Sequence, residues 1–155
     1  MIPATTERVS ENTADEINER IHRQTEENVA VCASSGAAGI DRRLRDLDHE
    51  WDIERTLEAN AASVALFGVA MGAFVDRKWF ALPAIVCGFL LQHAVQGWCP
   101  PVPLFRRLGV RTSTEIDEER YALKSLRGDF HGLPTLNDAR SDGAAVSRTL
   151  EAVRR

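Results

Sequence analysis

Two side chains in the middle of the chain could take part in chemistry, His93 and Cys99. His93 stands in a long apolar segment beside Gln92 and Gln96, and an ionisable residue in a membrane segment is a functional candidate by default. It could line a path for protons or small solutes in an oligomeric channel, or it could be a neutral histidine bonded to a neighbour. The other histidines are distant in sequence and no metal-ligand spacing is present, so we expect no metal site.

The Cys99 thiol lies between Trp98 and Pro100, at the end of the same apolar segment. A thiol there could be acylated, oxidised or sulfurated, which would make the chain an accessory to a sulfur-transfer partner protein. The alternative is a packing role, because no CxxC motif, adjacent histidine or acid–base partner accompanies it. The loop after Cys32 lacks the arginine that a phosphate- or persulfide-binding loop uses, so it is interpreted as a helix-breaking linker. We therefore predict no catalytic residue and no cofactor.

Charge is segregated along the 155 residues. From Ala59 to Phe105 the only charged residues are Asp76, Arg77 and Lys78, whereas both flanks are rich in charge. This pattern is typical of a membrane segment between aqueous arms, with the lipid bilayer as its partner. The net charge of −4, with basic and acidic residues interleaved, argues against a nucleic-acid partner. The first residues also lack the basic start and apolar run of a signal peptide.

The apolar stretch divides into two predicted spans, residues 59–75 and 79–98. At about 1.5 Å per residue they reach roughly 25 and 30 Å, against a hydrocarbon core of about 30 Å. Residues 76–78 are too few for anything but a turn, so the two helices must be antiparallel. A soluble protein with a buried central hairpin is the alternative, but the flanks hold few large apolar residues to cover one. The sequence predicts an all-α fold, a two-span transmembrane helical hairpin with amphipathic helical cytoplasmic arms.

Small and polar residues recur at intervals of about four on both spans, where helices in lipid associate by close packing. We predict that two stripes face each other within the hairpin: Ala61, Ala65, Gly68 and Gly72 on the first span, and Ala84, Gly88, Gln92 and Gln96 on the second. The GxxxG spacing could instead drive homodimerisation, and spacing alone does not separate the two.

The arms are predicted to be helical. Residues 1–50 form the first arm, with a helix over about 14–32 that is opened by a capping box at Thr13, and a second over about 40–58. The second helix carries an apolar stripe and should continue into the first span, because no Gly or Pro intervenes. Residues 113–155 form the other arm: a helix from a cap at Thr112 and Glu115 to a stop at Gly128, a loop over about 130–142, and a flexible tail with a short helix.

Basic residues near the span ends predict the orientation. The flanks carry more Lys and Arg than the turn, which places both termini in the cytoplasm and makes this a multi-pass protein of the bacterial inner membrane. An antiparallel hairpin also brings the start of the first span beside the end of the second. We therefore expect ion pairs between an acidic set and a basic set: Glu50, Asp52 and Glu54 with Arg106, Arg107 and Arg111.

The motif around the second span, Gly97-Trp98-Cys99-Pro100 followed by Gly109 and Thr112, resembles the YgaP-like inner-membrane domain family. The similarity covers residues 51–112, with Trp51–Arg55 before the first span and Trp79 at the turn. It implies a two-helix hairpin in the bacterial inner membrane that is implicated in dimerisation. Some members carry a sulfur-transferring rhodanese domain in front of the hairpin. This chain has no room for one, so sulfurtransferase activity is not implied.

One departure from the family pattern is the longer link between Cys99 and Gly109, which contains Pro101–Pro103 and Phe105–Arg107. It weakens any expectation of a close geometric role for the Cys-Pro pair. Taken together, the residues predict a small, non-enzymatic membrane protein that self-associates as a homo-oligomer or anchors a partner.

Overall fold

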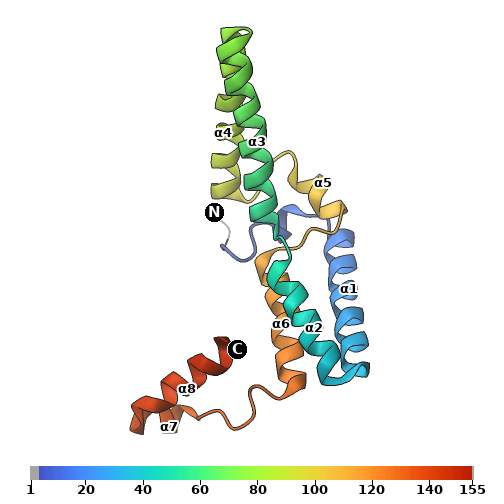
Figure 1. Ribbon diagram of the computed structural model, residues 1–155, viewed down its shortest axis with the longest axis vertical. Helices are drawn as coiled ribbons and strands as arrows, with labels where there is room; N and C mark the ends of the chain where they lie inside the picture. Colours follow the sequence, from blue (N-terminus) through green and yellow to red (C-terminus); the bar gives the residue numbers. More distant parts are fainter. Residues whose placement is uncertain (1–3, 155) are drawn as a thin grey trace. The chain divides into compact units, whose positions relative to one another are not determined.

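The computed structural model describes residues 4–154, except the side chains of residues 136, 139 and 141, and this part of the chain is helical without a β-strand (Figure 1). The all-α prediction is therefore confirmed. The contacts divide the chain into two units. Unit 1 comprises Met1–Thr25 and His49–Asp117, and unit 2 comprises Glu26–Asp48 and Glu118–Arg155.

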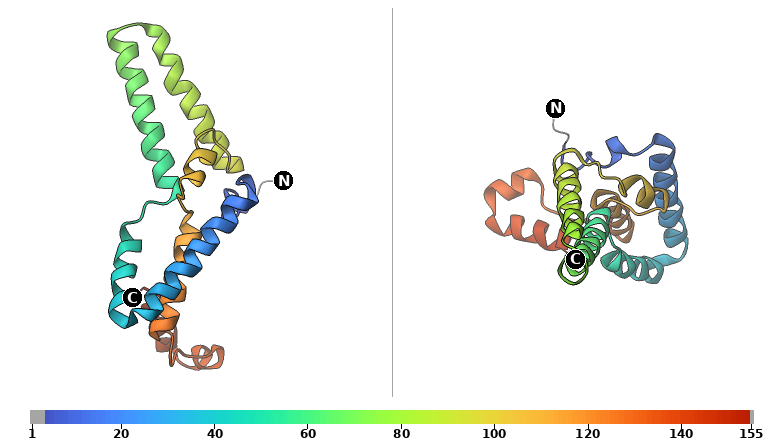
Figure 2. Two further views of the ribbon diagram at one scale, coloured as in Figure 1. Left: turned by 90° about the vertical axis from the view of Figure 1, so that its right-hand side faces the viewer. Right: turned by 90° about the horizontal axis from the view of Figure 1, so that it is seen from above.

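Unit 1 is built around a helical hairpin, α3 (Ile53–Phe74) and α4 (Ala81–Gln96), joined by the 3-10 turn η2 (Arg77–Phe80). The Asp52 carboxylate accepts the backbone N–H of Arg55 and so starts α3, and Asp76 accepts that of Lys78 and starts the turn. The two helices are antiparallel and diverge from the turn towards their other ends (Figure 2). They contain most of the two predicted spans.

Two stretches, Gly36–Phe74 with α2 and α3 and Arg77–Gln96 with η2 and α4, are long and apolar enough to cross a membrane. Only 17% and 6% of their apolar windows are buried. Large apolar side chains on the hairpin are exposed, including Leu66 (70%), Phe74 (88%) and Leu91 (68%). The core helix of a soluble protein would bury such residues, so this hairpin has an apolar surface that unit 1 itself does not cover.

The predicted continuous helix over 40–58 is wrong, because α2 (Gly36–His49) ends before α3 begins at Ile53. The helix is interrupted here without Gly or Pro, because residues 50–53 form hydrogen bonds outside the helix. The Glu50 carboxylate binds Arg111, Asp52 caps α3, and the Ile53 N–H donates to the carbonyl of Arg111 at 2.8 Å. Side-chain and long-range hydrogen bonds thus replace the helical ones at this point.

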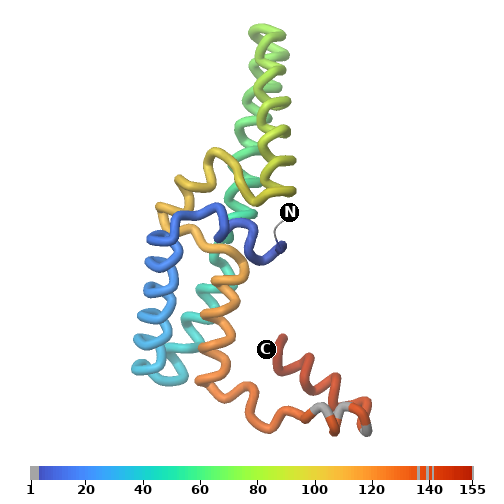
Figure 3. Tube along the Cα trace, turned by 180° about the vertical axis from the view of Figure 1, so that it is seen from behind, coloured from blue at the N-terminus to red at the C-terminus, as the bar shows by residue number. Residues whose placement is uncertain are grey.

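The N-terminal strap, residues 4–13 with the 3-10 turn η1 (Ser10–Asn12), lies beside the end of α4 (Figure 3). Arg8 Nη1 donates to the Ala94 carbonyl at 3.0 Å, and Asn12 Nδ2 donates to the Gln96 carbonyl at 2.8 Å. Two carbonyls that a helix C-terminus leaves without intrahelical partners are thereby satisfied. The positive charge of Arg8 also interacts favourably with the negative end of the α4 helix dipole.

Beyond α4, the short helix α5 (Val102–Arg107) leads to α6 (Ser113–Arg127). The predicted cap of α6 is confirmed: the Thr112 N–H donates to the Glu115 carboxylate at 2.7 Å, and Thr112 Oγ1 accepts the Glu115 N–H at 3.2 Å. Gly128, with φ of 90°, ends the helix as predicted. Helix α5 was not predicted. Pro101 is its N-cap and Pro103 stands in its first turn, where a missing N–H costs little.

Helix α1 (Asp15–Ser34) begins close to its predicted start. The Thr13 hydroxyl is engaged outside that helix: it donates to the Val9 carbonyl at 2.7 Å and accepts from Arg106 Nε at 3.2 Å. The capping box that we predicted at Thr13 therefore gives way to contacts with residues that lie 4 and 93 positions away along the chain.

Unit 2 contains the later part of α1, most of α2, the end of α6, and helices α7 (Leu136–Ser141) and α8 (Gly143–Arg154). Of the apolar stripe predicted at Ile40, Leu44, Leu47 and Trp51, the first three residues are buried, whereas Trp51, which belongs to unit 1, is exposed. Glu119 is fully buried and accepts two hydrogen bonds from Arg43, at 2.6 and 3.0 Å. Within this unit, therefore, a charged pair accompanies the apolar stripe.

The predicted loop over 130–142 contains helix α7. Thr135 starts it with a capping box, in which its hydroxyl and N–H bond the N–H and carboxylate of Asp138. The predicted terminal helix corresponds to α8. Thr135 and Asp138 form this box with Asp at the third helical position, where the common pattern has Glu or Gln, and α7 was therefore not predicted.

Candidate functional site

The predicted small-residue stripe on α3 faces the other arm of the hairpin. Gly68 and Gly72 are buried, and a Cβ at these positions would lie 2.7 Å from Pro83 Cδ and 2.9 Å from the Phe80 ring. Ala61 and Ala65 on the same side of α3 are half-buried. The two glycines therefore allow the bulky side chains of the turn and of the first residues of α4 to approach the α3 backbone closely.

The partner stripe on α4 differs from our prediction. Gly88 is exposed and a Cβ there would meet nothing within 4 Å, and Ala84 and Gln96 are also exposed. Gln92 Nε2 lies 3.5 Å from Gln96 Oε1 on the surface of α4. Large residues instead fill the space that the glycines of α3 leave, and so the small stripe of α4 points away from α3. In the hairpin, small residues of α3 therefore contact large residues of the turn and of the start of α4.

His93 joins three segments at the open end of the hairpin. Its ring is 5% exposed, and Nε2 lies 2.8 Å from Glu54 Oε2 on α3. The other Glu54 oxygen accepts from Arg8 Nη2 of the strap at 2.7 Å. His93 Nδ1 and Arg8 Nε are buried and have no hydrogen-bond partner among the described residues. This arrangement ties the strap, α3 and α4 together and follows the interpretation of His93 as a residue bonded to a neighbour.

Cys99 is 5% exposed and belongs to an apolar cluster at the same end of the hairpin. Its neighbours in the cluster are Val9, Ile53, Leu57 and Val102. Burial raises the pKa of the Cys99 thiol, which lowers the fraction present as the nucleophilic thiolate. The surroundings of this thiol are those of a packed side chain.

Arg106 is fully buried and links α5 to α6 and to the start of α1. Its guanidinium donates two hydrogen bonds of 2.7 Å to the Glu115 carboxylate. It also donates to Asn18 Oδ1 at 2.9 Å and to the Val110 carbonyl at 3.1 Å. Burial opposes ionisation of Glu115, but the bonds from Arg106 and the Thr112 N–H outweigh it and hold the pKa of Glu115 below its usual range.

The expected pairing between the acidic and basic sets is confirmed for one pair. Arg111 donates to both Glu50 oxygens at 2.8 Å. Glu54 instead pairs with Arg8 and His93, and Arg106 pairs with Glu115, because the strap and the cap of α6 bring closer partners. Sequence reasoning did not identify Arg8 or Glu115 as partners, since each pairing depends on how distant segments meet.

The residues that carry the resemblance described above lie in turns and caps between α4 and α6. Gly97 ends α4 with φ of 76°, and a Cβ there would lie 2.1 Å from the Arg8 carbonyl oxygen. Gly109 has φ of 86° in the link to α6, which Thr112 caps. Trp98 is half-buried and Pro100 is exposed. The residues of the motif occupy places where the chain changes direction.

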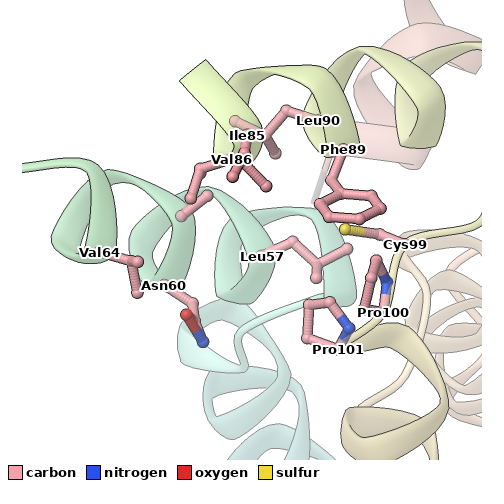
Figure 4. A pocket seen from close by; sticks show the side chains of 11 residues that line it. Leu57, Asn60, Val64, Ile85, Val86, Phe89, Leu90, Cys99, Pro100 and Pro101 are labelled. Atoms are coloured by element: carbon pink, nitrogen blue, oxygen red, sulfur yellow. The ribbon is translucent and has the colours of Figure 1, made fainter. Parts of the chain in front are cut away.

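An apolar groove of about 420 Å³ opens between the diverging helices (Figure 4). Leu57 and Val64 line it from α3, Ile85 and Phe89 from α4, and Cys99, Pro100 and Pro101 close one end. Asn60 is the only amide side chain that lines it. The volume is within the range of small-molecule pockets, roughly 300–1,000 Å³.

No group of three or more metal-ligating side chains is found among the residues that the structure describes. The described arrangement therefore consists of a helical hairpin, a polar cluster that ties its open end to the strap, and an apolar groove. No family model, curated protein or solved structure matches the chain.

Proposed function

We propose that the α3–α4 hairpin inserts into the bacterial inner membrane and anchors the helical arms, and a partner bound to them, at its cytoplasmic face. The observation that carries this proposal is the exposure of the hairpin: its apolar windows are 17% and 6% buried, and Phe74, Leu66 and Leu91 are among the most exposed large side chains. In water this surface would be unfavourable, whereas acyl chains would cover it at no cost.

The polar cluster at the open end supports an anchoring role. The Arg8–Glu54 pair joins the strap to the hairpin, Arg111 pairs with Glu50 just before α3, and the buried Arg106 pairs with Glu115 and joins α5 to α6. These pairs give the segments around the base of the hairpin a fixed geometry, because a bidentate guanidinium–carboxylate pair restricts orientation as well as distance. An anchor needs such a joint between its membrane segment and its aqueous segments.

The surroundings of the other two candidate residues support a structural role. Cys99 is packed in an apolar cluster, and burial raises the pKa of its thiol. The His93 ring lies against Glu54, and the hairpin alone encloses no path beside it. No observation favours a thiol-handling accessory or a channel over an anchor. Gly97 and Gly109 form turns with positive φ, and the open surface around Gly88 leaves room for self-association.

The proposal is tested by sodium carbonate extraction of membranes from cells that express the chain. We expect the wild-type chain to stay in the membrane pellet. Leu66→Glu, in the centre of α3, should reduce the pelleted fraction, because a charge at mid-bilayer costs roughly 2.5–3.5 kcal/mol. Val31→Glu is the matched control, since Val31 is 64% exposed on α1, outside the hairpin.

The opposite result is a wild-type chain that carbonate releases and that stays monodisperse in buffer without detergent, which would exclude membrane insertion. Reporter fusions to the two termini test orientation separately. Both should be active on the cytoplasmic side if the basic flanks decide the topology.

A further inference from the structure

The groove between α3 and α4 raises the question of what fills it. Its lining is apolar apart from Asn60, and it lies where the two helices diverge (Figure 4). If the hairpin lies in a membrane, as proposed above, this space cannot hold stable water, because an apolar cavity offers water no hydrogen bonds. An empty groove would forfeit the dispersion contacts of its walls. Something apolar must therefore occupy it.

The dimensions do not admit a whole helix of a second copy inside the groove. The α3 side of the groove extends from Leu57 to Val64, about 10 Å at 1.5 Å per residue. A helix about 10 Å in diameter occupies roughly 800 Å³ over that length, nearly twice the groove volume of about 420 Å³. Pro100 and Pro101 also close one end, so a helix could not continue past it. A flexible, narrow chain fits both constraints.

The position of Asn60 indicates what kind of chain occupies the groove. It is exposed at the groove, and its side-chain amide makes no hydrogen bond to any residue that the structure describes. It lies near the start of the predicted span, at the level where the hydrocarbon core meets the polar headgroups. An amide in that position needs a hydrogen-bond partner, and a phospholipid ester carbonyl at the same depth can accept from it.

We propose that the groove holds one acyl chain of a bilayer phospholipid, with the ester of that chain hydrogen-bonded to the Asn60 amide. The acyl chain passes between Val64 and Ile85 towards the bilayer centre, while the prolines separate it from the aqueous side. The lipid thus completes the packing between two helices that contact each other near their turn and, through His93 and Glu54, at their open end. No group in the phospholipid reacts, so Cys99 acts as part of the wall.

The test measures phospholipid retained by the full chain, reconstituted with dioleoylphosphatidylcholine and then re-purified in mild detergent. Mass spectrometry of the intact complex and of extracted lipid gives the stoichiometry. The wild-type chain should retain about one phospholipid. Val64→Trp, which fills the groove from its rim, should lower retention about tenfold. Losing the burial of roughly two methylene groups of the acyl chain is enough to weaken binding by that factor.

Val69→Trp is the matched control, because Val69 is an exposed valine on the same helix that does not line the groove. It should retain lipid like the wild type. Asn60→Leu leaves the groove open and removes only the amide, so it provides a variant that does not depend on tolerance of a large ring. It should also lower retention, by less than Val64→Trp.

Each outcome decides the inference. Equal retention by Val64→Trp and Val69→Trp, or a wild-type chain without bound phospholipid, overturns it. A lipid-free dimer that Val64→Trp dissociates assigns the groove to a second copy and also overturns it. Carbonate extraction of the same proteins separates this result from the proposed function. A chain that stays in the membrane without retained lipid contradicts the inference alone, whereas a chain that carbonate releases contradicts both.

Discussion

Arg106 and Glu115 form a two-point ion pair in the interior of unit 1, with both hydrogen bonds at 2.7 Å and the arginine fully buried. Glu115 also completes the capping box that Thr112 opens at the start of α6, since it accepts the Thr112 N–H. One carboxylate therefore starts a helix and neutralises a buried cation. Because the same guanidinium reaches Thr13 and Asn18 of the N-terminal part, this pair links α5, α6 and the start of α1.

Removing the cation should destabilise the protein severely. Arg106→Met leaves the Glu115 carboxylate buried without its partner, which costs about 3–5 kcal/mol for pairs of this kind. Thermal unfolding in detergent micelles, followed by circular dichroism, measures the loss. Arg107→Met is the control, because Arg107 is the exposed neighbour and surface changes usually stay within about 0.5 kcal/mol. Equal stability of the two variants would contradict the structural role of Arg106.

The stability contributed by Glu115 should disappear in acid. Its pKa is lowered in the folded state from the ordinary value of 4.5, so the folded chain binds this proton less readily than the unfolded chain. The contribution is therefore complete above about pH 4.5 and is lost as the pH falls through the folded-state pKa. Unfolding of the wild type and Glu115→Gln across this range tests it. The stability difference between them should shrink below pH 4.5, and a constant difference would contradict the prediction.

Gly97→Ala should release the N-terminal strap. The new Cβ would lie 2.1 Å from the Arg8 carbonyl oxygen, in addition to the strain of a positive φ. Gly109→Ala is the matched control, since φ is 86° and a Cβ there meets nothing within 4 Å. Both variants lose roughly 1–2 kcal/mol from strain, but only Gly97→Ala should raise the rate of tryptic cleavage after Arg8, by about tenfold for each further 1.4 kcal/mol.

Two helical glycines of the hairpin should respond to alanine in opposite directions. Gly88→Ala should be neutral or stabilising by up to about 1 kcal/mol, because the space around it is open and alanine favours a helix. Gly68→Ala places a Cβ 2.7 Å from the rigid Pro83 ring and should destabilise the hairpin by about 1–3 kcal/mol. Thermal unfolding in micelles at several protein concentrations gives both values.

The concentration series also tests self-association. A Gly88→Ala variant that loses stability, and loses more of it at high protein concentration, would show that a second copy covers this face. A stabilising Gly68→Ala would instead mean that the contact between α3 and Pro83 is absent in solution.

The sequence predicted the elements that local patterns determine. The apolar run and its three-residue charged turn gave the hairpin, and the Thr112–Glu115 spacing gave the start of α6. Residues 50–53 were missed because their geometry depends on Arg111, about 60 positions away. Local propensity there favours a continuous helix, and only the folded unit supplies the competing hydrogen bonds.

The candidate site was predicted at the level of residues rather than of contacts. His93 and Cys99 were identified by type and position, and both lie at the open end of the hairpin. Val9 could not be identified as a neighbour of Cys99, because the strap has no periodicity that would place it there. Glu54, the partner of His93, was expected to pair with the arginines after the second span. The small residues of α4 were assigned to the wrong side, since spacing gives a face of a helix but not what lies opposite.

The N-terminal strap has a consequence for the order of assembly. Arg8 bonds Ala94, 86 positions further along the chain, so residues 4–13 are synthesised long before their binding place exists. Residues 4–13 remain without these bonds until the α3–α4 hairpin is complete and Gly97 has been added. Closure of this end is therefore a late folding step, slowed by the entropy of a long loop. Until then, the carbonyls at the end of α4 depend on water.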